Sequence, residues 1–443
     1  MFVVYPVDGF WIWETTYILT PERRFRKGLR KSMKNRSSML SFFVVMCLFN
    51  MAASFAHPVT PTVIKDLNLH DYMFGVALAS MMIANFLMSP FWGKINTYIS
   101  SRNTLLICCF GYGIGQVMFG LATTELMIIL ARVFAGIFTG GAYVSFLTYI
   151  VNSSSEAERG SNLMISATIQ SVCSAFGYMI GGLLGEISVL LSFMAQAGTL
   201  MVCGILFFLI TKKDNIYTLS QLSTSQLVRE ANPFIAFVDS RKFMTVMFTV
   251  AYSVVALSNL GYTAYEQCFN YYIKDQFGFT SSYNGLIKAA VGLISLVANM
   301  TICRWIIRKT NSKKSAVPVM LCCAVSILGV ILAQDVMTFM VINVVFFAFN
   351  AVTVPVVQNV VASGADKGQG NMVMAFYNAI KNLGGIVGSL TAGFIYSAGP
   401  KLSFVFACAA FALGAVMAGI YAKSGGVEVI RARKMAQTQQ NNL

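Results

Sequence analysis

Charged side chains are scarce in this sequence. Only 11% of its 443 residues are Asp, Glu, Lys or Arg and 56% are hydrophobic, whereas roughly 25% of the residues of a soluble protein are charged. A soluble fold is therefore excluded. The apolar runs last about 20 residues, the length with which an α-helix crosses ~30 Å of hydrocarbon, and the ~10-residue alternation of a β-barrel does not occur. The composition predicts an all-α, polytopic membrane protein.

Groups that hold metals or cofactors are also lacking. The ten cysteines lie in or at the ends of apolar runs, without CxxC pairs or histidines at metal spacing, so we expect them to be small buried apolar residues. The two histidines, His57 and His70, fall close together in sequence, and no pair of acids or Ser/His pair is found at facing depths. No G-x-x-x-x-G-K-[ST] loop occurs. We expect no metal, no cofactor, no ATP hydrolysis and no enzymatic activity.

The apolar runs predict twelve membrane helices in two groups of six. The first group is expected near 39–62, 72–97, 104–123, 125–150, 160–185 and 189–210. The second is expected near 243–267, 282–307, 314–333, 336–362, 370–396 and 401–422. The predicted organisation is an N-terminal segment (1–38), a six-helix half (39–210), a central loop (211–242), a second six-helix half (243–422) and a tail (423–443).

The distribution of Lys and Arg predicts the orientation. All 32 of these residues except six lie in the termini, the central loop and the loops on the same side of the membrane. The exceptions are Lys65, Lys274 and Lys401 in the opposite loops, and Arg132, Lys288 and Lys381 within helices. By the positive-inside rule both termini are expected in the cytoplasm, with the protein in the plasma membrane. The net charge of +15 then reflects topology and contact with anionic lipid, and no binding of nucleic acid is expected.

The segment before the first helix has an unusual order. The aromatic stretch MFVVYPVDGFWIWETTYILT precedes the basic stretch PERRFRKGLRKSMKNR, the reverse of the order in a signal peptide. One interpretation is an interfacial anchor, with the aromatic residues in the headgroups and the basic stretch on anionic lipid. The other is that translation begins near Met33 or Met39.

The two halves resemble each other at an offset of about 210 residues. The stretch ERGSNLMISATIQSVCSAFGYMIGGLLG (158–185) corresponds to GQGNMVMAFYNAIKNLGGIVGSLTAGFI (368–395), and GKINTYISSRN (93–103) falls opposite RWIIRKTNSKK (304–314). Repeated halves with a binding site at their interface are typical of transporters that work by alternating access.

From these features and three motifs, residues 39–422 resemble the major facilitator superfamily, and within it the twelve-helix drug/proton antiporters that include the tetracycline exporters. LFNMAASFAHPVTP is similar to that group's P-v-x-P pattern. ARVFAGIFTGG is similar to R-x-x-x-G-x-x-x-G, with Arg132 as its basic residue, and GYMIGGLLG is similar to G-P-x-x-G-G. The resemblance implies roles in gating or proton coupling for Arg132 and for the glycines of the last motif, Gly177, Gly181 and Gly182.

Two positions depart from the family pattern. Tyr178 stands where the antiporter motif has proline. The loop between the second and third helices keeps Gly93 and the basic Arg102 of G-x-x-x-D-R-x-G-R, but Thr97 occupies the aspartate position. The resemblance therefore implies a role in gating for Gly93 and Arg102. This chain lacks the aspartate that makes the gate contact in the family.

Lys381 is the least expected charge in the sequence. If its helix begins near Gly370, Lys381 lies eleven residues along it, roughly 16 Å from the membrane surface and so near the midplane. A lysine at that depth cannot snorkel to the surface and needs a polar cavity or a partner. We expect either that Lys381 binds substrate together with Asn378, or that its amine is satisfied by Asn378, Gln358 or backbone carbonyls.

The remaining intramembrane charges have more than one interpretation. Glu266 and Lys288 fall at similar depth and are expected either to pair as a structural clamp or to take part in substrate or proton work. Arg132 is expected to support coupling or to be a satisfied structural charge. A group that titrates near working pH is needed for proton coupling, and Glu266 and His57 are the candidates, since the unperturbed pKa of histidine is ~6.5.

Polar residues in the middle of other helices are expected to line the same cavity with Lys381, although each is individually more typical of contacts between helices. The candidates for substrate binding are Gln170, Asn50, Tyr262 and Asn350; Asn85, Asn259 and Tyr265 have similar positions.

The buried cations outnumber the buried acid, so the cavity is expected to favour neutral or anionic solutes over lipophilic cations. The leading hypothesis is a monomeric secondary carrier that exports a small organic molecule by alternating access, driven by protons. An alternative is a proton-coupled uptake symporter for a sugar or organic-acid nutrient. A non-transporting membrane receptor on the same fold is the alternative of another class.

Overall fold

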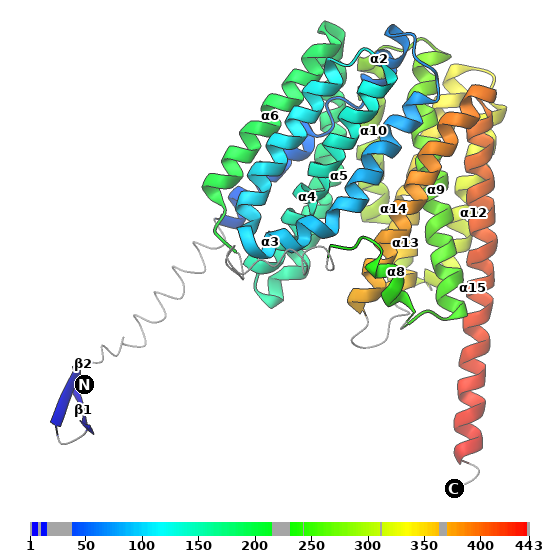
Figure 1. The fold of residues 1–443 in the computed structure, drawn as a ribbon. Helices are drawn as coiled ribbons and strands as arrows, with labels where there is room; N and C mark the ends of the chain where they lie inside the picture. The colour runs from blue at the N-terminus through cyan, green and yellow to red at the C-terminus, as the bar shows by residue number, and fades with distance from the viewer. Residues whose placement is uncertain are drawn as a thin grey trace.

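The structure is a computed structural model that describes residues 2–7, 10–15, 38–214, 231–241, 243–310, 312–362 and 370–440. Apart from one short hairpin, these residues form a bundle of long α-helices (Figure 1). The hairpin pairs β1 (Phe2–Val7) with β2 (Phe10–Thr15) in antiparallel register. These strands were not predicted, although Asp8-Gly9 between them is a dipeptide that favours two-residue hairpin turns. The expected interfacial anchoring of this segment stays a prediction.

The first helix (Ser38–Ala52) ends ten residues before its predicted end. A turn follows, and the chain resumes as the short helix α2 (Thr60–Asp66), with Pro61 in its first turn. Proline has no N–H and its ring clashes with the carbonyl four residues earlier, so Pro58 cannot continue the first helix. The prediction of one helix over 39–62 was wrong at this point.

The rest of the N-terminal half is formed by α3 (Met73–Gly120), α4 (Glu125–Ser153), α5 (Glu156–Ile187) and α6 (Val189–Ile210). Helix α3 is two membrane helices in one, because its backbone leaves the helical region at Ser100, where φ is 75°. The Asp214 carboxylate accepts hydrogen bonds from Ser100 Oγ (2.8 Å) and from Ser101 N and Oγ (both 2.7 Å). It therefore caps the second of these two helices.

The short α8 (Ile235–Ser240) lies within the predicted central loop, and the C-terminal half begins with the long α9 (Val246–Asp275). Helix α10 (Ser281–Ala298) passes through the π-helical turn η2 (Asn299–Cys303) into α11 (Arg304–Lys309). The half is completed by α12 (Ser312–Leu332), α13 (Val336–Ala362), α14 (Gly370–Ala398) and α15 (Leu402–Gln440). Helix α9 ends at Asp275, beyond its predicted end near 267.

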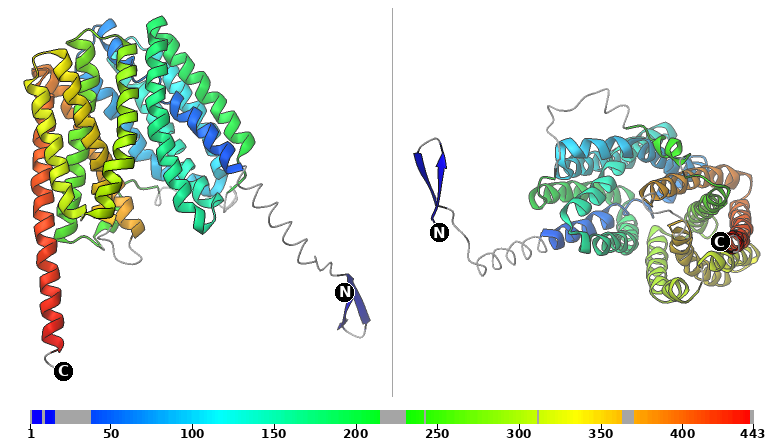
Figure 2. Two further views of the ribbon diagram at one scale, coloured as in Figure 1. Left: turned by 180° about the vertical axis from the view of Figure 1, so that it is seen from behind. Right: turned by 90° about the horizontal axis from the view of Figure 1, so that it is seen from below.

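Nine helices among the described residues are long and apolar enough to cross a membrane. Because α3 contains two membrane helices, these nine helices give ten crossings. The first helix, continued by α2, gives the eleventh and α14 gives the twelfth, so the all-α fold with twelve membrane helices is confirmed. The first helix begins and α15 ends at one end of the bundle, which we call the tail end; α2 lies at the opposite end, the α2 end (Figure 1). Viewed along the bundle, the helices of the two halves form two adjacent groups (Figure 2).

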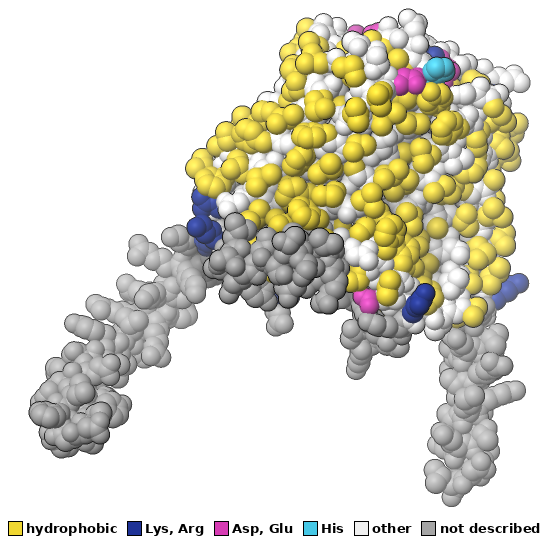
Figure 3. Space-filling view, in the orientation of Figure 1, with side chains coloured by type: hydrophobic (Ala, Val, Ile, Leu, Met, Phe, Trp, Pro, Cys, Tyr) yellow, Lys and Arg dark blue, Asp and Glu magenta, His cyan; other side chains and the backbone are white. Residues whose placement is uncertain are grey.

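The surface of the bundle fits a bilayer. On the face shown in Figure 3 the side of the molecule is largely hydrophobic, and charged side chains gather at its two ends. Large apolar residues such as Leu40, Leu209, Met337 and Val325 are more than 60% exposed, as expected for side chains that contact lipid.

The two halves pack on each other through small residues. A methyl group on Gly182 of α5 would overlap the carbonyl of Ser281 in α10, and one on Gly285 of α10 would come 2.5 Å from the carbonyl of Tyr178. Between α3 and α14, Gly75 and Gly393 approach in the same way. Glycine lets helix backbones come this close, so these two contacts hold the halves together around the space between them.

Candidate functional site

A cavity of about 320 Å³ lies between the halves. Its polar and aromatic lining comes from the N-terminal half, with Asn382 of α14 as the contribution from the other half. The N-terminal residues include His57, Asn85, Tyr112, Tyr143 and Tyr178. A pocket of this size, with aromatic walls and a few polar groups, suits a small organic molecule.

The turn after the first helix forms part of this wall and is held by two buried side chains. The break at Pro58 leaves backbone groups without helical partners. Gln196 of α6 accepts a hydrogen bond from Ala56 N (3.0 Å) and donates to Ala53 O (3.1 Å) and to the Tyr112 hydroxyl (3.1 Å), which itself donates to Ala53 O (3.1 Å). The polar groups freed by the broken helix are thereby satisfied, and the position of His57 is fixed.

His57 stacks on Tyr178 of α5, with 5.3 Å between ring centroids and 12° between their planes. Both residues line the main cavity and also a smaller one of about 20 Å³. Tyr178 is the residue that replaces the proline of the antiporter motif. Its hydroxyl and ring extend the aromatic wall to the contact between the halves.

Glu266 and Lys288 form the ion pair that their similar depth predicts, with Lys288 Nζ 2.9 Å from Glu266 Oε1. The Lys288 side chain is 5% exposed and that of Glu266 is 22% exposed. The ammonium lies 5.1–5.8 Å from the ring centroids of Phe347, Phe269 and Tyr178, a favourable position for a buried cation. Because Tyr178 belongs to α5, the ion pair of one half contacts the other half.

Tyr262, a predicted substrate ligand, lies one helical turn before Glu266 on α9, beside this ion pair. The acid therefore has Lys288 as its ion-pair partner and Tyr262 as a neighbour, both from its own half. Any change in the charge of Glu266 alters the environment of both.

Arg132 of α4 is buried without a carboxylate partner among the described residues. Its Nη2 donates to Thr60 Oγ1 (3.2 Å), its Nη1 contacts Met81 Sδ (3.6 Å), and the guanidinium lies 4.2 Å from the Phe119 ring centroid. Its Nε has no hydrogen-bond partner. Arg132 also lines the smaller cavity beside His57, so it brings an unneutralised cation to the site.

Lys381 and Asn378 lie on the face of α14 that is directed toward the N-terminal half. One turn further along this face, a methyl group on Gly385 would come 2.6 Å from Met82 of α3, and Asn382 lines the main cavity. The Lys381 side chain is exposed to solvent, although neighbouring helices surround it on all sides. This combination is expected for a residue that faces a central space between helices. Within the described part of the chain no hydrogen bond satisfies its amine, so the expected bonds to Asn378 or Gln358 are not formed.

The other predicted ligands are dispersed. Gln170 lies within hydrogen-bonding reach of the Tyr143 hydroxyl on the cavity wall. Asn50 is fully buried in the first helix, where its Nδ2 donates to Met46 O (2.8 Å) and its Oδ1 has no partner. Asn350 is buried in α13. Neither Asn50 nor Asn350 lines the main cavity.

The motif glycines act in helix packing. Methyl groups on Gly177 and Gly181 would overlap the carbonyls of Met51 and Phe55, which brings α5 against the first helix and its turn. Gly93 faces Val144 of α4, where a methyl group would make an ordinary contact at 3.6 Å. Arg102 places its guanidinium 3.8 Å from the centroid of the Phe208 ring at the end of α6.

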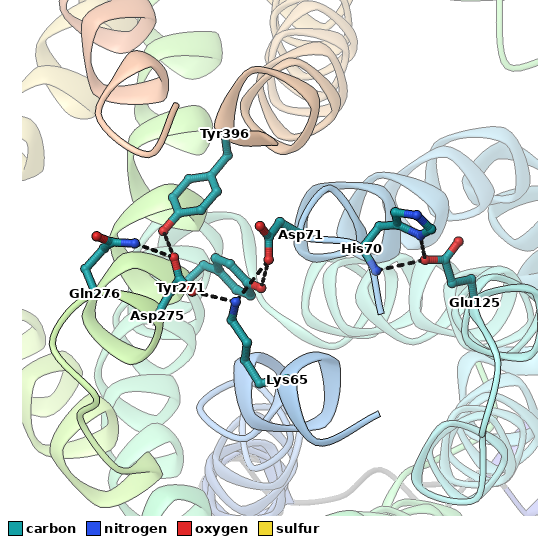
Figure 4. A network of polar contacts seen from close by, with 8 residues as sticks. All are labelled: Lys65, His70, Asp71, Glu125, Tyr271, Asp275, Gln276 and Tyr396. Atoms are coloured by element: carbon teal, nitrogen blue, oxygen red, sulfur yellow. Dashed lines mark hydrogen bonds and ion pairs between the residues drawn. The ribbon is translucent and has the colours of Figure 1, made fainter. Parts of the chain in front are cut away.

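A second cluster of charges closes the α2 end (Figure 4). Lys65 Nζ lies 2.5 Å from Asp275 Oδ1 and 3.1 Å from Asp71 Oδ1. The Tyr271 hydroxyl donates to Asp71, and the Tyr396 hydroxyl donates to Asp275 Oδ2 (2.7 Å). Lys65 and Asp71 belong to the N-terminal half and the other three to α9 and α14, so the cluster joins the halves. We call these five residues the α2-end latch.

The sequence does not predict the latch, since it shows Lys65 only as one of the few cations in the opposite loops. Burial opposes the charge on Lys65, but hydrogen bonds with the Asp275 and Asp71 carboxylates outweigh it and raise the pKa of Lys65 above its ordinary value of 10.5. Beside the latch, Glu125 Oε1 accepts hydrogen bonds from His70 N (3.1 Å) and Nδ1 (2.7 Å) within the N-terminal half (Figure 4). His70 therefore ties loops together and lies away from the cavity.

Comparison with known proteins agrees with this architecture. The sequence model of the Major Facilitator Superfamily matches residues 42–350 and 268–436. The chain is 22% identical over 368 residues to multidrug resistance protein 1 of Bacillus subtilis (strain 168), across 81% of this chain and 89% of that protein. It is 20% identical over 368 residues to the class H tetracycline resistance protein of Pasteurella multocida, across 81% of this chain and 89% of that one.

Among solved structures, the fold is similar to that of a bacterial homologue of the human lysosomal transporter Spinster in an inward-facing, unoccupied conformation. The TM-score is 0.70 at 13% identity, with 88% of this chain and 97% of that chain covered. The two resistance proteins confirm the resemblance to the drug antiporter group drawn from the motifs. The chain belongs to the Major Facilitator Superfamily, and it is a multi-pass membrane transporter of small molecules and not an enzyme.

Proposed function

We propose that this transporter exports a neutral or anionic small organic solute from the cytoplasm across the plasma membrane, driven by protons. The observation that carries the proposal is the charge of the central site. Arg132 and Lys381 have no carboxylate partner in the described part of the chain, while Glu266 is already paired with Lys288. Two unneutralised cations near one cavity attract an anion and disfavour a lipophilic cation.

Alternating access requires the halves 39–210 and 243–422 to rock about their shared contacts. The α2-end latch and the glycine contacts Gly182–Ser281 and Gly75–Gly393 close the site toward the α2 end. With both termini in the cytoplasm, as the Lys and Arg distribution predicts, this is the state that takes up solute from the cytoplasm.

Glu266 is the proposed proton acceptor. Its carboxylate neutralises Lys288, and this pair contacts Tyr178 of the other half. Protonation of Glu266 would leave the Lys288 ammonium unpaired in a buried site, an unfavourable state that a bound anion or a movement of the halves relieves. His57, stacked on the same tyrosine, is the second group through which a proton could pass.

Export is the proposed direction because the chain is similar to proteins named for multidrug and tetracycline resistance. An uptake symporter would use the same gradient with the opposite direction of net solute flux.

The test is flux in proteoliposomes with an imposed pH gradient. The purified protein is presented with a panel of organic anions, neutral solutes and organic cations, and its orientation is determined by protease access to the C-terminal tail. We expect gradient-driven antiport of an anionic or neutral solute out of the tail-end side. Flux of organic cations that anions do not inhibit would overturn the proposed substrate class, and cotransport with protons would overturn the proposed direction.

A further inference from the structure

The smaller cavity beside His57 lies between the two halves, and its volume is about 20 Å³. His57 and Tyr178 line both this cavity and the main one, whereas Thr60 of α2 and Tyr271 of the α2-end latch line only the smaller one. It therefore lies between the main cavity and the latch. None of the transport steps proposed above assigns an occupant to it.

Two buried polar atoms of opposite kind belong to the wall of this cavity. Arg132 of α4 is 3% exposed and Asn270 of α9 is 7% exposed, and both line the cavity. Within the described residues, Arg132 Nε has no acceptor and Asn270 Oδ1 has no donor. Buried polar groups that lack a protein partner are expected to have an ordered water or an ion as partner. One of these two atoms belongs to the N-terminal half and the other to the C-terminal half, so one bound molecule could join the halves.

The size and the chemistry of the cavity fit water. A buried water needs about 10–15 Å³, so a cavity of about 20 Å³ holds one and excludes an organic solute. A water molecule accepts and donates hydrogen bonds at the same time, so it can satisfy Arg132 Nε and Asn270 Oδ1 together. The polar side chains of Gln267 and Tyr178 on the same wall are further neighbours for it.

The guanidinium is held for this contact by its own half. Arg132 Nη2 donates to Thr60 Oγ1 (3.2 Å), and Thr60 Oγ1 donates in turn to Ala56 O (2.9 Å). The Phe119 ring, 4.2 Å from the guanidinium, supports the same position. Arg132 is therefore fixed to α2 and to the turn before it, while Nε is left for a partner in the cavity.

We propose that a water molecule in the smaller cavity bridges Arg132 and Asn270 and forms part of the closed α2 end. Asn270 then acts as a positioning residue that holds the Arg132 side chain, through the water, against the other half. Opening of the α2 end carries α9 away from α4 and breaks the bridge, so Arg132 is joined to the C-terminal half in the closed state only. This inference depends on the geometry of the closed α2 end, and on neither the class of solute nor the direction of transport proposed above.

A small inorganic anion is the other occupant that a buried guanidinium attracts. The oxygen of Asn270 disfavours it, because an amide oxygen repels an anion and gains a hydrogen bond from water. The two occupants are distinguished by a crystal structure of the full-length protein grown in bromide, at a resolution that shows ordered water. We expect density within hydrogen-bonding distance of both Arg132 Nε and Asn270 Oδ1, without the anomalous signal of bromide. A cavity without density, or one with a bromide signal, would overturn the proposal.

The role of the bridge is tested by spin-label distances across the α2 end. Asn270→Leu should raise the ratio of open to closed molecules about fivefold, as expected for the loss of one hydrogen-bonded contact. Asn284→Leu is the matched control and should leave the ratio unchanged. Asn284 is likewise buried in the C-terminal half, with an Oδ1 that has no partner among the described residues, but it does not line the cavity. An equal ratio in Asn270→Leu and the wild type would overturn the proposal.

Two further variants separate the bridge from a merely structural role. Asn270→Asp places a carboxylate opposite the guanidinium and should lower the ratio of open to closed molecules below that of the wild type, which keeps the test decisive if Asn270→Leu fails to fold. In the Arg132→Gln background, Asn270→Leu should have no further effect on the ratio. Additive effects of the two substitutions would show that Arg132 and Asn270 act independently and would contradict a shared water.

Discussion

The Lys65 ammonium lies 2.5 Å from the carboxylate of Asp275, across the contact between the two halves of the transporter. The same ammonium lies 3.1 Å from Asp71 on its own half. Any movement that opens the α2 end must therefore separate Lys65 from Asp275. Since Lys65 is partly exposed, the contact contributes at most about 1 kcal/mol, enough to bias an equilibrium between two states and not enough to lock it.

Charge reversal tests this latch. Lys65→Asp and Asp275→Lys should each slow transport, because each places like charges across the contact. The double variant Lys65→Asp/Asp275→Lys should recover a large part of the flux, measured in proteoliposomes. Lys274→Gln, which changes the neighbouring lysine outside the latch, is the control. Additive losses in the double variant would show that the two residues do not act as a pair.

The pH dependence of the closed α2 end follows from the raised pKa of Lys65. A raised pKa means that the stabilisation by this ammonium is fully present below 10.5 and is lost as pH rises through the higher value in the closed state. In the Glu266→Gln variant, which lacks the proposed coupling carboxylate, the closed population should stay constant between about pH 7 and 9, where Asp and Lys side chains are both charged. Distances between spin labels on α2 and at the end of α9 would measure it, and a transition within this range would contradict the assignment.

Glu266→Gln should uncouple transport from the proton gradient. Flux driven by a pH gradient should be lost while exchange of solute without a gradient persists. The variant should also be less stable by about 3 kcal/mol, because Lys288 is left buried and unpaired.

Glu266→Gln/Lys288→Met is the companion variant, since it removes both charges at similar volume. It should recover most of the stability in a thermal unfolding assay without recovering coupling. Gradient-driven flux in the double variant would show that protons bind elsewhere.

Gly182→Ala should impair the movement of the halves. The added methyl group would overlap the Ser281 carbonyl in the other half, at a cost of about 1–3 kcal/mol in the closed state. Gly198→Ala is the matched control, because nothing lies within 4 Å of its added methyl group. Spin-label distances across the α2 end should lengthen in the first variant only, and equal distributions in the two variants would contradict the proposed contact.

Most of the helices could be predicted from the sequence, because a run of about 20 apolar residues is enough to specify a membrane helix. The predicted helix ends were wrong where particular residues, and not the hydropathy of the run, determine where the helix stops. The first helix stops before Pro58 although the apolar run continues, and α9 continues to Asp275 because its polar last turns meet partners in the latch. The ion pair of Glu266 and Lys288 could be predicted because both residues lie at comparable depth in consecutive helices.

The latch and the support of the turn could not be predicted in the same way. Asp275 lies in the other half, and although Asp71 is only six residues from Lys65, no sequence pattern pairs the two. Gln196 resembles any polar residue within a helix, and its importance depends on backbone groups that only the broken first helix exposes. Tyr178 departs from the antiporter motif in sequence, but its stacking on His57 depends on the packing of α5.

The cationic binding site is tested most directly by the effect of Lys381→Ala on gradient-driven flux of the solute found in the panel. Lys381 faces the central space without a partner in the described chain, so we assign its ammonium to the bound solute. We predict that KM for an anionic solute rises about tenfold or more, as expected for the loss of a charged hydrogen bond, while the thermal stability of the protein is unchanged or higher. Unchanged transport with reduced stability would instead make Lys381 a structural amine and contradict the cationic site.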